Sequence, residues 1–147
     1  MQFTTFLLSA LLSAGSLAAP LEPRAEAVSM MAQATTWTIT GLKRVVDAAD
    51  TTATWTFGIN NGATTVACTE VVKGSPASQT NGGPATCGQY TVTSGWSGQF
   101  GPGNGFTTFA VVDYAAGLIV YPAYTDKQVQ AGTVVTPDQS YTPSKLG

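Results

Sequence analysis

The sequence TATWTFGIN at Thr52–Asn60 alternates apolar and polar side chains along its whole length. Successive side chains of a β-strand point to opposite faces, so the alternation separates an apolar face from a threonine-rich face. The apolar set consists of Ala53, Trp55, Phe57 and Ile59. This pattern predicts a half-buried strand. The sequence Asn60–Gly62 then predicts a tight turn into a second strand over 64–72, because Asn and Gly tolerate the positive φ of hairpin turns.

Segments of similar β-rich character recur from Trp37 to the end of the chain. Further strands are expected over 88–93, 106–113, 118–122 and 133–136. Stretches rich in Gly, Pro, Ser and Asn predict loops over 74–86 and 94–105, and short helical turns are expected over 45–50 and 126–130. About seven to nine short strands with frequent turn residues are typical of an all-β protein, an antiparallel β-sandwich or β-barrel.

The N-terminal segment, residues 1–18, has the features of a secretory signal peptide. Its apolar run, Phe6–Leu12, leads to the small residues Ser16 and Ala18 at the spacing of a cleavage site. The run is too short to span a bilayer, and a buried N-terminal helix is the alternative. We therefore expect a secreted, extracellular protein that is cleaved after Ala18.

The rest of the chain predicts one domain. Residues 19–36 are small and polar and are expected to form a pro-segment, ending at Arg24, or a flexible N-terminal arm. Residues 37–147 are expected to form a single β domain, since a chain of this size can build one hydrophobic core.

Cys68 and Cys87 are the two cysteines of the chain. In an exported protein such a pair predicts one disulfide, although two free buried thiols are the alternative. On the chain-entropy account, closing a loop of about 20 residues stabilises a fold by roughly 3 kcal/mol. The bond would also hold the predicted loop over 74–86.

Charge and composition exclude several classes of partner and chemistry. The formal net charge is −2 and the charged residues are scattered, which argues against nucleic acid and anionic membranes as partners. The polar C-terminus over 136–147 argues against a lipid anchor. The chain has no histidine, which excludes Ser-His-Asp triads and the commonest metal ligand. No cofactor, metal or catalytic residue is predicted.

Paired carboxylates are the enzyme chemistry that the composition leaves open. A glycosidase needs two of them about 5–10 Å apart. Asp47 with Asp50, or Asp113 with Asp126, are the candidate pairs. The alternative is that these residues cap turns or lie solvated in loops.

Four aromatic residues lie in or beside Gly-rich and Pro-containing segments, where side chains often face solvent. These candidate surface-binding residues are Trp96, Phe100, Tyr121 and Tyr124. Aromatic faces stack on sugar rings or anchor a protein partner. The alternative is a core role, which we expect for Trp37 and Trp55 and which also suits Trp96 as a plug beneath its loop.

Several longer strings carry a family resemblance. They are Trp37–Ile39, Lys43–Arg44, Ala48–Thr51, Thr54–Asn60, Ala77–Pro84, Thr91–Phe100, Tyr121–Gln128 and Val135–Tyr141. Through them the chain resembles, over about residues 37–143, a family of small secreted proteins of filamentous fungi that includes hypersensitive-response-inducing elicitors. The resemblance implies an extracellular effector sensed by plant tissue and maps no catalytic site.

Three functional hypotheses follow from these observations. The leading one is a secreted, non-enzymatic effector-like or elicitor protein that triggers or modulates plant defence when a plant host surface component or receptor recognises it. The second is a carbohydrate or cell-wall binding module, with a wall polysaccharide as partner. The third is a small glycosidase that uses paired Asp residues.

Overall fold

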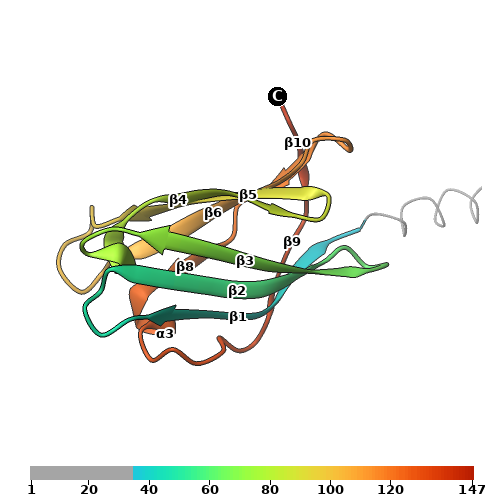
Figure 1. The fold of residues 1–147 in the computed structure, drawn as a ribbon. Coiled ribbons are helices and arrows are strands. Elements are labelled where there is room, and N and C mark those ends of the chain that lie inside the picture. The colour runs from blue at the N-terminus through green and yellow to red at the C-terminus, as the bar shows by residue number, and fades with distance from the viewer. Residues whose placement is uncertain (1–34) are drawn as a thin grey trace, which may run out of the picture. The chain divides into compact units, whose positions relative to one another are not determined.

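The computed structural model describes residues 35–147, which form two antiparallel β-sheets packed as a sandwich (Figure 1). This confirms the predicted all-β class and its sandwich form; in the described part of the chain the sheets do not close into a barrel. The expected signal peptide over 1–18, its cleavage site and the Arg24 processing site lie outside the described residues, as does most of the expected arm over 19–36.

The first sheet is four-stranded. It contains β1 (Trp37–Val46), β2 (Thr52–Asn60), β3 (Thr65–Lys73) and β9 (Gln139–Tyr141), in the spatial order β3-β2-β1-β9. The predicted hairpin is confirmed, because β2 and β3 pair continuously from Thr52 opposite Lys73 to Asn60 opposite Thr65. Gly62 in its turn has φ +94°, a conformation that glycine adopts without a steric penalty.

The second sheet is six-stranded. Its strands are β4 (Gly82–Cys87), β5 (Tyr90–Ser97), β6 (Phe106–Asp113), β7 (Leu118–Val120), β8 (Ala123–Thr125) and β10 (Ser144–Lys145). The order along the sheet is β10-β7-β6-β5-β4, and β8 pairs with the other end of β6. Within residues 35–147 there are two short helices, η2 (Ala77–Gln79) and α3 (Asp126–Val129).

Four local predictions need correction. The expected loops over 74–86 and 94–105 contain β4 and the end of β5, because pairing along β5 holds these Gly-containing segments extended. The expected strand over 133–136 is wrong, since a single backbone hydrogen bond, from Val135 N to Leu42 O, replaces a ladder there. The helical turn expected over 45–50 does not span that range. Val45 and Val46 end β1, and 47–50 form a turn that the hydrogen bond from Asp50 N to Asp47 O closes. The helical turn at 126–130 is confirmed.

Aromatic side chains fill the space between the sheets. Trp55 packs edge-on against Phe109 with ring centroids 4.9 Å apart, and Trp37 packs in the same way against Tyr90 at 5.1 Å. Trp37 and Trp55 are each 3% exposed, which confirms their predicted core role. Such edge-to-face pairs stabilise a core beyond the area they bury.

The predicted disulfide between Cys68 and Cys87 is confirmed. Cys68 lies in β3 and Cys87 ends β4, so the bond joins an outer strand of the first sheet to an outer strand of the second. Both cysteines are buried in the core cluster. The disulfide therefore holds one flank of the sandwich.

Candidate functional site

The four aromatic residues predicted for surface binding occupy different environments. Phe100 is 65% exposed and Tyr121 is 61% exposed, whereas Trp96 is half-buried. The expectation of exposure is wrong for Tyr124, which is 2% exposed. Tyr124 occupies the single inward position of the short strand β8 and packs edge-on against Phe109 in the core.

Trp96 lies beside the loop over 98–105, which connects β5 to β6. Two consecutive turns shape this loop, with hydrogen bonds from Gly101 N to Gly98 O (3.0 Å) and from Asn104 N to Gly101 O (3.1 Å). Gly101 has φ +95° and Gly103 has φ +81°, so both positions favour glycine. The loop thus has a fixed backbone path and few side chains.

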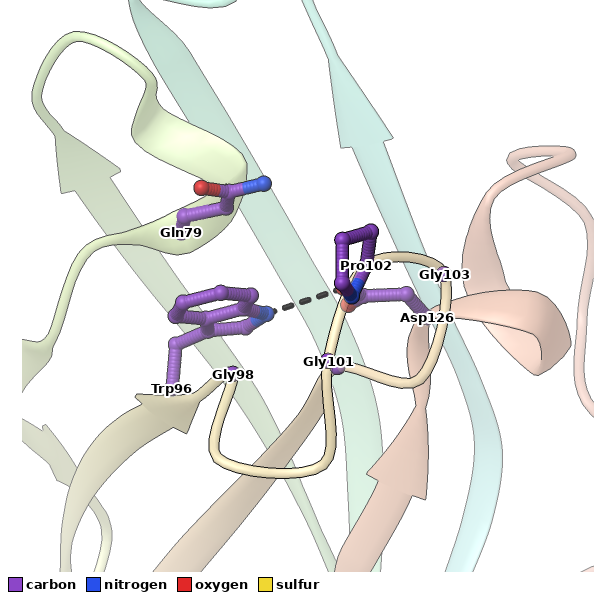
Figure 2. A pocket seen from close by; sticks show the side chains of 8 residues that line it. Gln79, Trp96, Gly98, Gly101, Pro102, Gly103 and Asp126 are labelled. Carbon is purple, nitrogen blue, oxygen red and sulfur yellow. Dashed lines mark hydrogen bonds between the residues drawn. The ribbon is translucent and has the colours of Figure 1, made fainter.

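A cleft of about 350 Å³ opens between this loop, η2 and the start of α3 (Figure 2). It is lined by Gln79, Trp96, Gly98, Gly101, Pro102, Gly103, Gly105 and Asp126. The indole of Trp96 forms one wall, the side chain of Gln79 lies across from the ring, and Pro102 lies beyond the nitrogen edge of the ring, beside Asp126. Trp96 Nε1 donates a hydrogen bond of 2.9 Å to Asp126 Oδ2, which fixes the plane of the ring.

Asp126 is held from inside the sandwich by Arg44 of β1. The Arg44 Nη1 atom lies 3.2 Å from Asp126 Oδ1 and also donates to Ser78 O at 3.3 Å. Arg44 is 5% exposed, and its guanidinium lies over the ring of Trp55, 5.5 Å from the ring centroid. The ion pair neutralises both charges at the base of the cleft, so the site as a whole carries little net charge.

Two glycines allow the indole to sit this close to the chain. A Cβ atom on Gly105 would lie 2.5 Å from Asp126 Oδ2 and 2.7 Å from a ring carbon of Trp96. A Cβ atom on Gly98 would lie 2.5 Å from the far edge of the same ring. Contacts this short do not occur between real side chains, so both positions need glycine for the cleft to keep its shape.

The residues that carry Gln79 are tied to the first sheet. Asp50 accepts hydrogen bonds from Ser78 N at 2.7 Å and from Ser78 Oγ at 2.6 Å. Asp50 also accepts from Ala77 N through its backbone oxygen, at 2.8 Å. These three bonds hold η2 against the turn after β1. They place the exposed side chain of Gln79 over the cleft.

An apolar depression lies on the other side of the loop. Phe100 stacks on Phe106 with ring centroids 5.7 Å apart. Together with Thr125 and Lys127 they border a hollow of about 400 Å³. Tyr121 borders neither this hollow nor the cleft. Of the four predicted aromatic residues, Phe100 and Tyr124 border one shared apolar hollow, whereas Trp96 and Tyr121 do not join them there.

Asp113 and Asp126 do not form the arrangement that glycoside hydrolysis needs, and the carboxylates of Asp47 and Asp50 are occupied by hydrogen bonds within the protein. Asp113 ends β6, whereas Asp126 N donates to Gly105 O just before β6 begins. At about 3.3 Å per residue, the two carboxylates are separated by a strand of roughly 23 Å. Asp47 accepts hydrogen bonds from Thr51 within its own turn, and Asp50 holds η2. Turn capping, the alternative that the sequence left open, is what the carboxylate of Asp47 does, whereas the carboxylate of Asp50 binds a distant segment.

Residues 35–147 contain no group of three or more His, Cys, Asp or Glu side chains placed to hold a metal ion. In that same range, no helix has the length and apolar character needed to cross a membrane.

Sequence reasoning did not identify Arg44 or Gln79 as parts of the site. A signal for Arg44 exists, because it stands between Leu42 and Val46 on the inward-facing side of β1, where an apolar residue is expected. A charged residue in such a position needs a buried partner. No local pattern marks Gln79, which belongs to a Pro- and Ser-containing loop.

Two comparisons identify the family. The family described as "Effector TSP1" has a sequence model that matches residues 38–146. A protein of the fungus Hypocrea virens that is named "Effector TSP1" is 57% identical over 148 residues, which cover 99% of this chain and 99% of that protein. The expected relation to fungal effectors is confirmed, and the chain belongs to the Effector TSP1 family.

Proposed function

We propose that the protein is a secreted, non-enzymatic effector that triggers or modulates the defence response of a plant host. The observation that carries this proposal is 57% identity, along nearly the whole chain, to a fungal protein named as an effector. The signal-peptide features of residues 1–18 support secretion, and the absence of histidine from the chain supports a non-enzymatic role.

The fold suits recognition by an extracellular host component. The confirmed disulfide is stable in an oxidising compartment, where it keeps a small sandwich folded. Exposed aromatic side chains anchor many protein interfaces, and Phe100, Tyr114 and Tyr121 are each more than half exposed. We propose that a plant surface component or receptor recognises such a folded surface rather than a linear peptide.

Infiltration of plant leaves with the purified secreted protein tests this function. The disulfide-intact protein is compared with a reduced and alkylated sample at equal concentration, and the oxidative burst, defence-gene induction and cell death are scored. A response to the intact protein alone is the expected result. No response to the intact protein contradicts the effector proposal, and equal responses to both samples contradict recognition of a folded surface.

Alanine variants locate the recognised surface. Phe100→Ala and Tyr121→Ala remove exposed rings from different segments, and we expect at least one of them to reduce the response at a given dose. Lys73→Ala, at the exposed end of β3 and outside the hollow that Phe100 borders, serves as a control without an aromatic ring. Full responses to both aromatic variants would contradict their role in recognition.

A further inference from the structure

We propose that the cleft between Trp96, Gln79 and Asp126 binds a neutral saccharide, with one sugar ring stacked on the indole of Trp96. This ligand class goes beyond the effector role proposed above and does not depend on whether leaf tissue responds. The argument rests on the shape of the cleft, on its hydrogen-bonding groups and on its charge.

The first step concerns the aromatic wall. Trp96 is half-buried, and its Nε1 is already bonded to Asp126, so the ring is fixed before any ligand arrives. Gly98 and Gly105 pack against its edges, and the cleft opens between the ring and the side chain of Gln79, with Pro102 beyond the nitrogen edge (Figure 2). A rigid aromatic face costs little conformational entropy when a ligand stacks on it.

The second step concerns the polar groups around that face. Each carboxylate oxygen accepts up to two hydrogen bonds. Asp126 Oδ2 receives one from Trp96 and Oδ1 receives one from Arg44, so both oxygens keep acceptor capacity. The exposed amide of Gln79 adds two donors and an acceptor across the opening. A sugar ring matches this arrangement, because it presents an apolar C–H face to the indole and hydroxyl groups at its rim.

The third step concerns charge and size. The Arg44–Asp126 ion pair balances the one carboxylate of the cleft, which removes the main attraction for a cationic ligand. Among the residues that the structure describes, no cationic side chain lines the opening, so an anionic ligand gains no partner there. The volume of about 350 Å³ is at the small end of the range for ligand sites. It suits one or two sugar rings of a longer chain that continues into solvent.

Titration of the folded protein with neutral oligosaccharides tests the proposal. The probes are the hexasaccharides of xylan, cellulose, β-1,3-glucan, mannan and chitin, with oligogalacturonate as an anionic comparison. Of the three tryptophans, Trp37 and Trp55 are 3% exposed, so a ligand that stacks in the cleft changes the fluorescence of Trp96. We expect a saturable change with at least one neutral probe and none with oligogalacturonate.

Variants assign the binding to the cleft by calorimetry. We expect Trp96→Ala to weaken binding at least tenfold and Gln79→Ala to weaken it several-fold, while Tyr121→Ala leaves it unchanged. Gln79 is exposed, so its variant keeps the assay informative if Trp96→Ala fails to fold. Absence of binding by every neutral probe at millimolar concentration overturns the proposal. Binding that survives both cleft variants, or binding of oligogalacturonate alone, overturns it equally.

Discussion

The guanidinium of Arg44 and the carboxylate of Asp126 lie 3.2 Å apart, although 82 positions separate the two residues in the chain. Arg44 belongs to the first strand of one sheet, and Asp126 begins the helix that follows β8 of the other. The pair therefore links the two layers of the sandwich at the base of the cleft. It couples the stability of the fold to the shape of the site.

Replacement of Arg44 by methionine should destabilise the protein by roughly 2 kcal/mol, because it removes a buried ion pair and leaves the carboxylate of Asp126 without its cationic partner. The exposure of Asp126, 24%, keeps this cost below that of a fully buried pair. Urea unfolding measures the change, and Lys127→Ala, which removes an exposed charge, should shift stability by less than about 0.5 kcal/mol. Equal stability of Arg44→Met and the parent protein would contradict a structural role for the pair.

Replacement of Gly105 by alanine should disrupt the cleft, because the new Cβ atom would overlap both Asp126 and the indole of Trp96. We expect a loss of about 1–3 kcal/mol and a red-shifted tryptophan emission as the ring moves toward solvent. Gly95→Ala is the matched control, since its Cβ atom would meet only Asn81 Oδ1, at 3.7 Å. Similar spectra and stabilities for the two variants would show that the close approach at Gly105 is not needed.

Glu70 should make the stability of the protein depend on pH. It is 1% exposed and accepts a hydrogen bond from Ser94 Oγ, and burial raises the pKa of its carboxyl above the ordinary 4.5 while that bond opposes the rise. A raised folded-state pKa means that its contribution to stability is fully present below the unfolded pKa and is lost as pH rises through the folded pKa. We therefore expect Glu70→Gln to be more stable than the parent protein at neutral pH.

The expected gain is present at about pH 7 and disappears below about pH 3, where Glu70 is protonated in both the folded and the unfolded state. Urea unfolding at a series of pH values measures it. Asp138→Asn, which changes an exposed carboxylate, is the control. A stability difference for Glu70→Gln that stays constant across the series would rule out this titration.

Replacement of Cys68 and Cys87 together by alanine should cost roughly 3 kcal/mol, because the unfolded chain gains the freedom of a loop of about 20 residues. Unfolding of the parent protein with and without reductant provides a second measurement. The reductant should have no effect on the double variant. A double variant as stable as the oxidised parent would show that packing alone holds that flank.

The local alternation of apolar and polar residues correctly predicted strands that bury one face and expose the other. Thr52–Asn60 alternates regularly and forms the expected strand with its hairpin partner. It failed at β4, whose Gly82-Gly83-Pro84 start has the composition of a loop, and at 133–136, where Val134 and Val135 resemble a strand. The presence or absence of a strand partner decides both cases, because β4 pairs with β5 whereas 133–136 pairs with no strand, and a single-sequence pattern does not show which segments find a partner.

The candidate site was only partly predictable for the same reason. The loop at 94–105 identified Trp96 and Phe100 as residues of interest, and Phe100 is exposed as expected. The carboxylate and the amide that complete the cleft come from Asp126 and Gln79, which lie in other parts of the chain. The burial of Tyr124 was missed because β8 has only three residues, too few to show an alternation.

The last residues of the chain contribute a strand to each sheet. β9 pairs with β1 on the first sheet, and β10 pairs with β7 on the second, on the flank away from the disulfide (Figure 1). The first strand thus obtains its second neighbour only when residues 139–141 have left the ribosome. Because Thr38 and Ser140 pair across 102 positions of the chain, completion of this flank is a long-range step of folding.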